Sequence, residues 1–241
     1  MNSFRIKLAD VVIDVSTTFH RAYNVCKDFI TNEKEDVSVK TDFNDIRVEA
    51  EKTEKELNVD APSNVHLEVV TLLRKIADIL IDYDTILMHG AAIGFESEGY
   101  LFSAPSGTGK TTHIYKWLER IPNVFVVNGD KPFIRIYDNG DRPLVCGSPW
   151  AGKENLYTNI MIPLKAIILM ERSEINHIEQ ITFNEAFPLL YQQVYHPDDP
   201  VKIIKTLYLV KHLQPDVSFW RFKCNNFKDD CFETAFRALI S

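Results

Sequence analysis

The spacing of apolar and polar residues along the chain predicts a succession of strands and helices. Alternation at every second position predicts a half-buried strand at Phe4–Leu8, with Val11–Val15 as its neighbour. Apolar residues recur at helical spacing from Asn64 to Tyr83, so this stretch is predicted to be a helix that Asn64 caps. Continuous apolar runs at residues 86–93 and 164–170 predict buried strands.

The same reasoning extends to the remaining elements and to the domain organisation. We predict strands at 100–103, 123–127 and 217–222, and helices at 113–120, 184–194, 200–212 and 228–240. Residues 45–57 are so highly charged that they are either a solvated helix or the end of a strand. We place a domain boundary after residue 62. It separates a small strand-containing N-terminal subdomain of unknown role, 1–62, from a domain that carries the candidate chemistry, 63–241.

Composition and charge limit the classes of protein to consider. Of the 241 residues, 45% are hydrophobic and 25% are charged, as in ordinary globular proteins. The net charge of −7 argues against a nucleic-acid binder with a broad basic face. Residues 27–60 hold 11 acidic and 6 basic side chains, so the rest of the chain is close to neutral.

The cysteines and the apolar runs indicate the compartment. The four cysteines form no Cys-x-x-Cys pair, so we do not expect a zinc site. We find no signal peptide and no stretch long enough to span a bilayer. We therefore expect a cytoplasmic protein with free thiols and with neither nucleic-acid nor membrane partners.

The stretch from Ala104 to Thr112, Ala-Pro-Ser-Gly-Thr-Gly-Lys-Thr-Thr, carries the clearest chemical signal. It lies between a predicted strand and a predicted helix, which is the setting of a phosphate-binding loop. Lys110 is expected to reach the β- and γ-phosphates, and the Thr111 hydroxyl to bind Mg²⁺. The alternative is a glycine-rich turn without a ligand, because Ala104 replaces the first glycine of the usual pattern. The candidate nucleotide-binding residues of this stretch are Ser106, Gly107, Thr108, Gly109, Lys110, Thr111 and Thr112.

Asp130 and His89 are candidates for catalysis. Asp130 follows the strand predicted at 123–127, where an acid would hold Mg²⁺ or accept a proton from an attacking hydroxyl. The alternative is a turn residue, since Asn-Gly-Asp is favourable turn chemistry. His89 lies in the apolar run 86–93 and is either a buried structural histidine or a contact for the transferring phosphoryl group or for Asp130.

Three cations and one aromatic residue are weaker candidates. Lys153, in an aperiodic loop rich in Gly and Pro, is a candidate phosphate contact, and Trp150 of the same loop would stack on a base or wall the site. The alternative is a packed loop in which Trp150 is part of the core. Arg172 follows the strand predicted at 164–170 and either stabilises phosphoryl charge or forms a surface ion pair. Lys131 either neutralises phosphate charge or is a solvated turn residue.

Together these motifs resemble the HPr kinase–related proteins. That family shares its catalytic fold with HPr kinase/phosphorylase and, more remotely, with ATP-dependent phosphoenolpyruvate carboxykinase. The resemblance covers roughly residues 85–240 and is carried by His89-Gly90, the loop 106–112, Asp130-Lys131-Pro132 and Gly147–Lys153. It implies an α/β fold with a mixed sheet and a P-loop. It also implies ATP with Mg²⁺, or Mn²⁺ as the alternative ion, and phosphoryl transfer to a hydroxyl.

The resemblance also implies roles for individual residues. Lys110 and Thr111 match the phosphate and metal residues, and His89 matches the histidine close to the γ-phosphate. Asp130 matches the second of two adjacent acids, whereas Gly129 stands where the family has the first. Restoring that acid with Gly129→Asp is expected to raise metal affinity or turnover.

The leading prediction is an ATP-dependent kinase with an alcohol group as acceptor, in a Ser or Thr of a protein or peptide or in a small molecule. Its catalytic residues would be Asp130, His89 and Lys110, and its metal ligands Thr111 and Asp130. The chain is also compatible with a homo-oligomer. Because one acid serves where relatives use two, the alternative is a nucleotide-binding regulatory or assembly module with little turnover. A plain ATPase is the third possibility.

Overall fold

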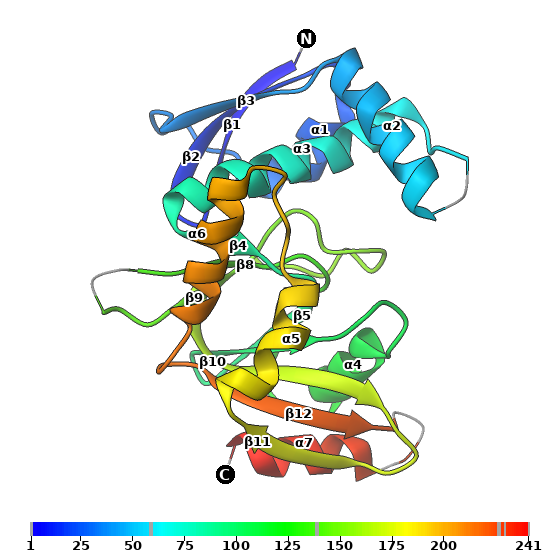
Figure 1. Ribbon diagram of the computed structural model, residues 1–241, viewed down its shortest axis with the longest axis vertical. Coiled ribbons are helices and arrows are strands. Elements are labelled where there is room, and N and C mark those ends of the chain that lie inside the picture. The colour runs from blue at the N-terminus through cyan, green and yellow to red at the C-terminus, as the bar shows by residue number, and fades with distance from the viewer. Residues whose placement is uncertain (1, 58–59, 138–139, 226–227, 229, 241) are drawn as a thin grey trace. The chain divides into compact units, whose positions relative to one another are not determined.

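The computed structural model describes residues 2–57, 60–137, 140–225, 228 and 230–240 (Figure 1). The chain divides into two compact units, Met1–Tyr83 and Asp84–Ser241, which we call unit 1 and unit 2 and describe separately. The division falls 21 residues after the boundary predicted at residue 62, and helix α3 (Asn64–Leu80) belongs to unit 1.

Unit 1 contains a small sheet and three α-helices among its described residues. Strand β2 is antiparallel to β1 and parallel to β3. The elements are β1 Asn2–Leu8, β2 Val11–Thr17, α1 Arg21–Cys26, η1 Lys27–Phe29, β3 Val37–Lys40, α2 Phe43–Leu57, α3 Asn64–Leu80 and η2 Ile81–Tyr83. The charged stretch 45–57 is therefore helical.

Helix α3 belongs to unit 1 because a buried carboxylate fixes it there. Glu68 is fully buried and accepts hydrogen bonds from the backbone N–H groups of Thr18 and Phe19, at 2.6 and 2.8 Å, and from the Thr41 hydroxyl at 2.8 Å. A buried carboxylate requires such donors, and the sequence pattern of the helix does not reveal them. The N-cap of α3 is Ser63, without a side-chain cap bond, rather than the predicted Asn64.

The described part of unit 2 contains one mixed sheet of nine strands, which confirms the predicted mixed α/β class. Seven strands run in the order β4-β8-β9-β10-β6-β5-β7, while β12 pairs with both β10 and β11. The strands are β4 Thr85–Leu87, β5 Ala91–Phe95, β6 Glu98–Ser103, β7 Phe125–Asn128, β8 Phe133–Arg135, β9 Leu144–Cys146, β10 Met161–Arg172, β11 His177–Ile181 and β12 Ser218–Cys224. The helices are α4 Lys110–Arg120, α5 Phe183–Gln193, α6 Pro200–Lys211 and α7 Asp230–Ile240.

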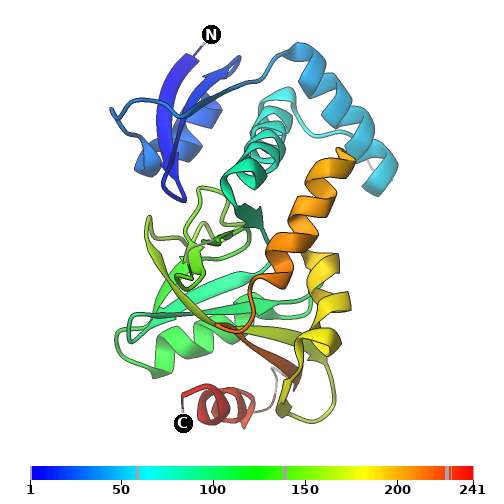
Figure 2. The same ribbon diagram turned by 60° about the vertical axis from the view of Figure 1, so that its left-hand side comes forward.

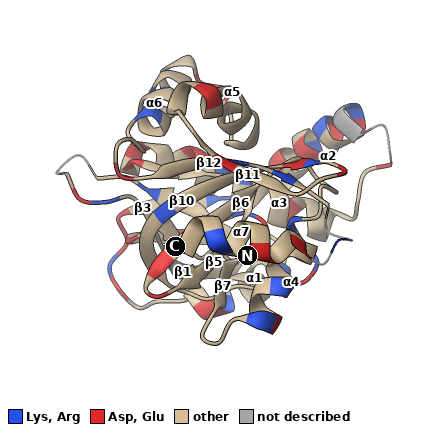
Figure 3. Cartoon of the chain, turned by 90° about the horizontal axis from the view of Figure 1, so that it is seen from below, with Lys and Arg blue, Asp and Glu red and all other residues tan. Residues whose placement is uncertain are grey.

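Helices cover both faces of this sheet. Helices α4 and α7 pack on one face, where Ile114 and Trp117 of α4 are buried, while α5 and α6 belong to the core of the other face through Leu190 and Leu209 (Figures 2 and 3). Burial of apolar side chains on both faces explains the continuous apolar runs of the central strands. Across the described residues, no helix combines the length and the apolar character needed to cross a bilayer.

The strand directions bring four chain segments to one edge of the sheet. Strand β6 is parallel to β10 and antiparallel to β5, and β5 is antiparallel to β7. The carboxyl ends of β6, β7 and β10 and the amino end of β5 therefore meet at the same edge. The residues at that edge are the stretch after Ser103, Asp130, Arg172 and His89.

The single strand predicted at 86–93 is divided into β4 and β5. Strand β4 pairs with β8, whereas β5 pairs with β6 and β7, so the chain changes partners between them. At the change, the His89 N–H donates to the Gln193 carbonyl at 2.7 Å rather than to a strand of the sheet. His89 thus lies at a junction at the sheet edge and not within a buried strand.

Candidate functional site

The stretch 104–111, which we call the glycine loop, turns from β6 directly into α4. Gly107 and Gly109 have φ angles of +79° and +109°, a region that only glycine enters at little cost. Gly109 is the N-cap of α4, and the Thr108 hydroxyl donates to the Pro105 carbonyl at 2.9 Å across the turn. The first N–H groups of a helix have no partner within it and lie at its positive end. The loop therefore has the backbone geometry that favours an anion.

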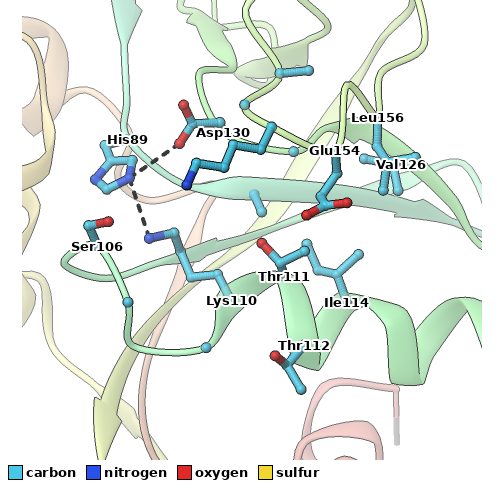
Figure 4. Close-up of a pocket in the computed structure, with 17 residues that line it drawn as sticks. His89, Ser106, Lys110, Thr111, Thr112, Ile114, Val126, Asp130, Glu154 and Leu156 are labelled. Carbon is cyan, nitrogen blue, oxygen red and sulfur yellow. Dashed lines mark hydrogen bonds and ion pairs between the residues drawn. The ribbon is translucent and has the colours of Figure 1, made fainter.

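A cavity of about 500 Å³ lies over the glycine loop (Figure 4). Figure 4 shows the apolar residues Ile114, Val126 and Leu156 at one end and His89 at the other, next to Asp130. The lining residues are His89, Ala91, Ser106, Gly107, Gly109, Lys110, Thr111, Thr112, Ile114, Val126, Gly129, Asp130, Ala151, Gly152, Lys153, Glu154 and Leu156. An apolar end and a cationic end in one cavity match the two halves of a nucleotide.

Three side chains from three separate segments meet at the polar end of the cavity. His89 Nε2 lies 3.4 Å from Lys110 Nζ and 3.3 Å from Asp130 Oδ1. His89 Nδ1 lies 3.1 Å from Gln193 Oε1, so both ring nitrogens of His89 have polar neighbours. The sequence predicted the three residues as candidates, and the sheet edge brings them into contact.

Asp130 is held as a carboxylate. Burial would raise the pKa of Asp130, but the hydrogen bond with His89 and the charge of Lys131 outweigh burial and lower the pKa below its ordinary value. Lys131 Nζ donates to Asp130 Oδ2 at 3.1 Å. One carboxylate oxygen thus faces His89 and the other faces Lys131, and the group is ionised throughout the neutral range.

Lys110 is largely buried and its ammonium bonds to the glycine loop itself. Nζ donates to the carbonyls of Ala104, at 2.7 Å, and Pro105, at 3.3 Å. Burial lowers the pKa of Lys110, and the charge of Asp130 opposes that effect. The ammonium is therefore fixed where the loop closes, beside both His89 and Asp130.

The position of Asp130 depends on a buried amide that the sequence analysis did not select. Asn128 is fully buried, and its Oδ1 accepts from the N–H groups of Asp130 and Lys131 at 2.8 and 2.7 Å. Its Nδ2 donates to the carbonyl and the hydroxyl of Ser148 at 2.9 and 3.0 Å. In the sequence, Asn128 is an asparagine at the end of an apolar strand, and the Asn-Gly-Asp pattern indicates only a turn.

Ser148 belongs to a segment that we call the Trp150 loop, residues 147–156. Trp150 itself is 8% exposed and does not line the cavity, so it packs in the protein rather than facing the space for a base. Lys153 does line the cavity, together with Gly152 and Glu154. Glu154 is a carboxylate that the sequence analysis missed, because nothing in an aperiodic loop distinguishes it.

A side chain at Gly129, where the resemblance places an acid, would be tightly packed. A Cβ atom at this position would lie 3.0 Å from the Ala151 carbonyl oxygen and 3.3 Å from that of Leu156. Gly129→Asp is therefore expected to destabilise the protein by about 1–3 kcal/mol through overpacking, instead of raising metal affinity as the sequence suggested. Denaturant unfolding of Gly129→Asp and Gly129→Ala checks this, since both carry the Cβ. If the wild type and both variants are equally stable, a Cβ atom at position 129 is not crowded by the carbonyls of Ala151 and Leu156.

Arg172 reaches the sheet edge but not the cavity. Its guanidinium donates to the Gly107 carbonyl, and its side chain lines a second cavity of about 360 Å³ on another side of the glycine loop. Leu169 and Leu189 also line this second cavity, and so does Gln193, whose amide contacts His89. Arg172 thus contacts the glycine loop from outside the first cavity. Thr108 also lies outside the lining of the first cavity.

Comparisons with known proteins add little to this geometry. No protein-family model matches the chain, and no curated protein sequence matches it. Among solved structures, the chain is similar to the structure of the Hpr(Ser) kinase/phosphatase from Coxiella burnetii, with 12% sequence identity, a TM-score of 0.30, and coverage of 53% of this chain and 91% of that chain. A likeness at this level indicates a distant relationship at most and carries no argument about activity. Function must therefore be argued from the site.

Proposed function

We propose that the protein is an ATP-dependent kinase that transfers a phosphoryl group to a hydroxyl. The observation that carries the proposal is the meeting of Lys110, His89 and Asp130 at the end of a cavity whose floor is a glycine loop and a helix N-terminus. The cavity volume of about 500 Å³ falls within the range of small-molecule sites. The sequence resemblance to HPr kinase–related proteins agrees with this assignment.

The chain supplies the groups that phosphoryl transfer requires. The N–H groups of the glycine loop and the Lys110 ammonium would bind the phosphates, because preorganised positive charge stabilises the transferring group. The adenine would lie at the apolar end, near Ile114 and Leu156. The acceptor hydroxyl would lie beside His89, lose its proton to Asp130 Oδ1, and form the new P–O bond as the bond to ADP breaks.

Mg²⁺ or Mn²⁺ fits the oxygen atoms of this cavity. The Thr111 hydroxyl and the Asp130 carboxylate both line it, and hard divalent cations prefer such ligands together with substrate phosphates. Among the described residues, no group of three His, Cys, Asp or Glu side chains could hold an ion alone, so the ion would enter with the nucleotide. When bound, it neutralises phosphate charge.

A second candidate function is a nucleotide-binding regulatory or assembly module with little turnover. The observation that favours it is Gly129, which leaves a single acid at the end of β7, at a position where a side chain would make tight contacts. In such a module, ATP binding would change assembly rather than be followed by transfer. A plain ATPase would pass the phosphoryl group to water.

Calorimetry with ATP in the presence and absence of Mg²⁺ tests the proposal. We expect ATP to bind more tightly with Mg²⁺, and γ-labelled ATP to label a library of Ser- and Thr-containing peptides or small alcohols. An absence of ATP binding would overturn the proposal. Binding without metal dependence and without turnover would favour the regulatory module, and phosphate release at one rate with or without acceptors would favour the ATPase.

A further inference from the structure

Glu154 of the Trp150 loop places a second carboxylate in the cavity that contains Thr111 and Asp130. Figure 4 shows its carboxylate pointing into the cavity on the side of Thr111 and Ile114, toward the first turn of α4. Glu154 and Asp130 come from different segments, and the sheet edge and the Trp150 loop bring both to the same space.

Glu154 is solvent-exposed and has few polar partners within the protein. The Tyr115 hydroxyl donates to Glu154 Oε2 at 3.5 Å, which is a long, neutral hydrogen bond. No Lys or Arg within the described ranges forms an ion pair with it, although Lys153 is its neighbour in the chain. An anionic side chain beside a phosphate site repels the phosphates unless a cation lies between them. A carboxylate in this place therefore favours a nucleotide that binds together with a cation over a nucleotide that binds without one.

Gly129 packs against the same loop that carries Glu154. The carbonyl oxygens of Ala151 and Leu156 would lie 3.0 and 3.3 Å from a Cβ atom at position 129. Both carbonyls belong to the Trp150 loop, and Glu154 lies between them in sequence. The loop that packs against Gly129, where the resembled family has an acid, therefore carries the acid Glu154 into the cavity.

We propose that Glu154 is the second carboxylate ligand, besides Asp130, of the divalent cation that would bind with the nucleotide, with the Thr111 hydroxyl as a further ligand. The inference rests on the proposed nucleotide site and adds to it a ligand from a different chain segment. Mg²⁺ usually binds one or two carboxylates together with substrate phosphates, and two carboxylates with one hydroxyl meet that requirement. Cation binding is then strong only when the phosphates are present.

Mn²⁺ binding, measured by the loss of the free-ion electron paramagnetic resonance signal with and without ADP, tests the inference without measuring activity. Glu154→Gln keeps the size and polarity of the side chain and removes the charge. We expect it to weaken the ADP-dependent binding of Mn²⁺ about tenfold or more. We expect ADP affinity in EDTA to be unchanged or slightly higher, because a repulsive charge is removed.

Glu119→Gln is the matched control, because Glu119 is an exposed carboxylate on α4 outside the cavity lining. Lys110→Ala separates the inference from the proposed function. If Glu154→Gln leaves Mn²⁺ binding unchanged while Lys110→Ala weakens ADP binding, the role of Glu154 as a ligand is overturned and the nucleotide site stands. Unchanged ADP binding in Lys110→Ala would overturn the nucleotide site itself. A loss of metal-free ADP affinity in Glu154→Gln would show that Glu154 contacts the nucleotide directly and would also overturn the inference.

Discussion

Lys110→Ala is expected to weaken ATP binding about 10- to 100-fold, the equivalent of one or two charged hydrogen bonds. The ammonium lies where the glycine loop closes, 2.7 Å from the Ala104 carbonyl, and beside His89 and Asp130 at the phosphate end of the cavity. Because Lys110 is largely buried, solvent and salt screen its charge less than they would at the surface.

A series of nucleotides makes this prediction specific. Calorimetry with ATP, ADP and AMP should show a large loss of affinity for ATP and ADP and a small one for AMP, which lacks the β- and γ-phosphates. Lys116→Ala is the matched control, since Lys116 lies on the same helix and its Nζ donates to the Lys228 carbonyl, away from the cavity. Equal losses for all three nucleotides would indicate a folding defect rather than a lost phosphate contact.

Asp130→Asn is expected to lower the turnover number about 10²- to 10³-fold, within the usual range for the loss of a general base. ATP affinity in EDTA should change little, because the proposed roles of the carboxylate are to accept the proton of the acceptor hydroxyl and to bind the cation, and EDTA removes the cation. The measurement is the single-turnover rate with saturating ATP, compared with ATP affinity in the same buffer. Asp84→Asn, which removes a carboxylate paired with Lys205 outside the cavity, is the control. Full turnover in Asp130→Asn would remove Asp130 from the mechanism.

The lowered pKa of Asp130 also predicts how stability depends on pH. The folded pKa lies below the unfolded value, so the ionised carboxylate stabilises the fold at pH values above the unfolded pKa. That contribution disappears as the pH falls through the lower folded pKa. The difference in unfolding free energy between wild type and Asp130→Asn should therefore be constant near neutrality and shrink below a pH of about 4. A difference that persists at lower pH would arise from packing.

The sequence could select the sheet-edge residues as candidates because their signals are local. A glycine loop between a strand and a helix, and an acid after the next strand, need no knowledge of distant contacts. The junction at His89 was predicted as a continuous strand because β4 and β5 are equally apolar. Only the change of pairing partners between them, which depends on the tertiary fold, separates them.

Other parts of the site had no local signal. Arg172 was placed at the correct sheet edge, but a strand pattern does not determine whether the side chain faces the cavity or the Gly107 carbonyl. Glu154 lies in a loop without periodicity, and its place in the cavity lining depends on how that loop packs against Gly129. Such contacts between distant segments are invisible in the sequence of a single protein.

The buried amide of Asn128 has a consequence for how this site tolerates change. One side chain holds the backbone of Asp130 and, through Ser148, the start of the loop that carries Glu154. A substitution at either position 128 or position 148 therefore shifts both acidic segments at once. Their mutational effects should be strongly epistatic, so that the double variant costs little more than either single one. The two side chains therefore act as one unit, and the effect of changing either depends on whether the other is intact.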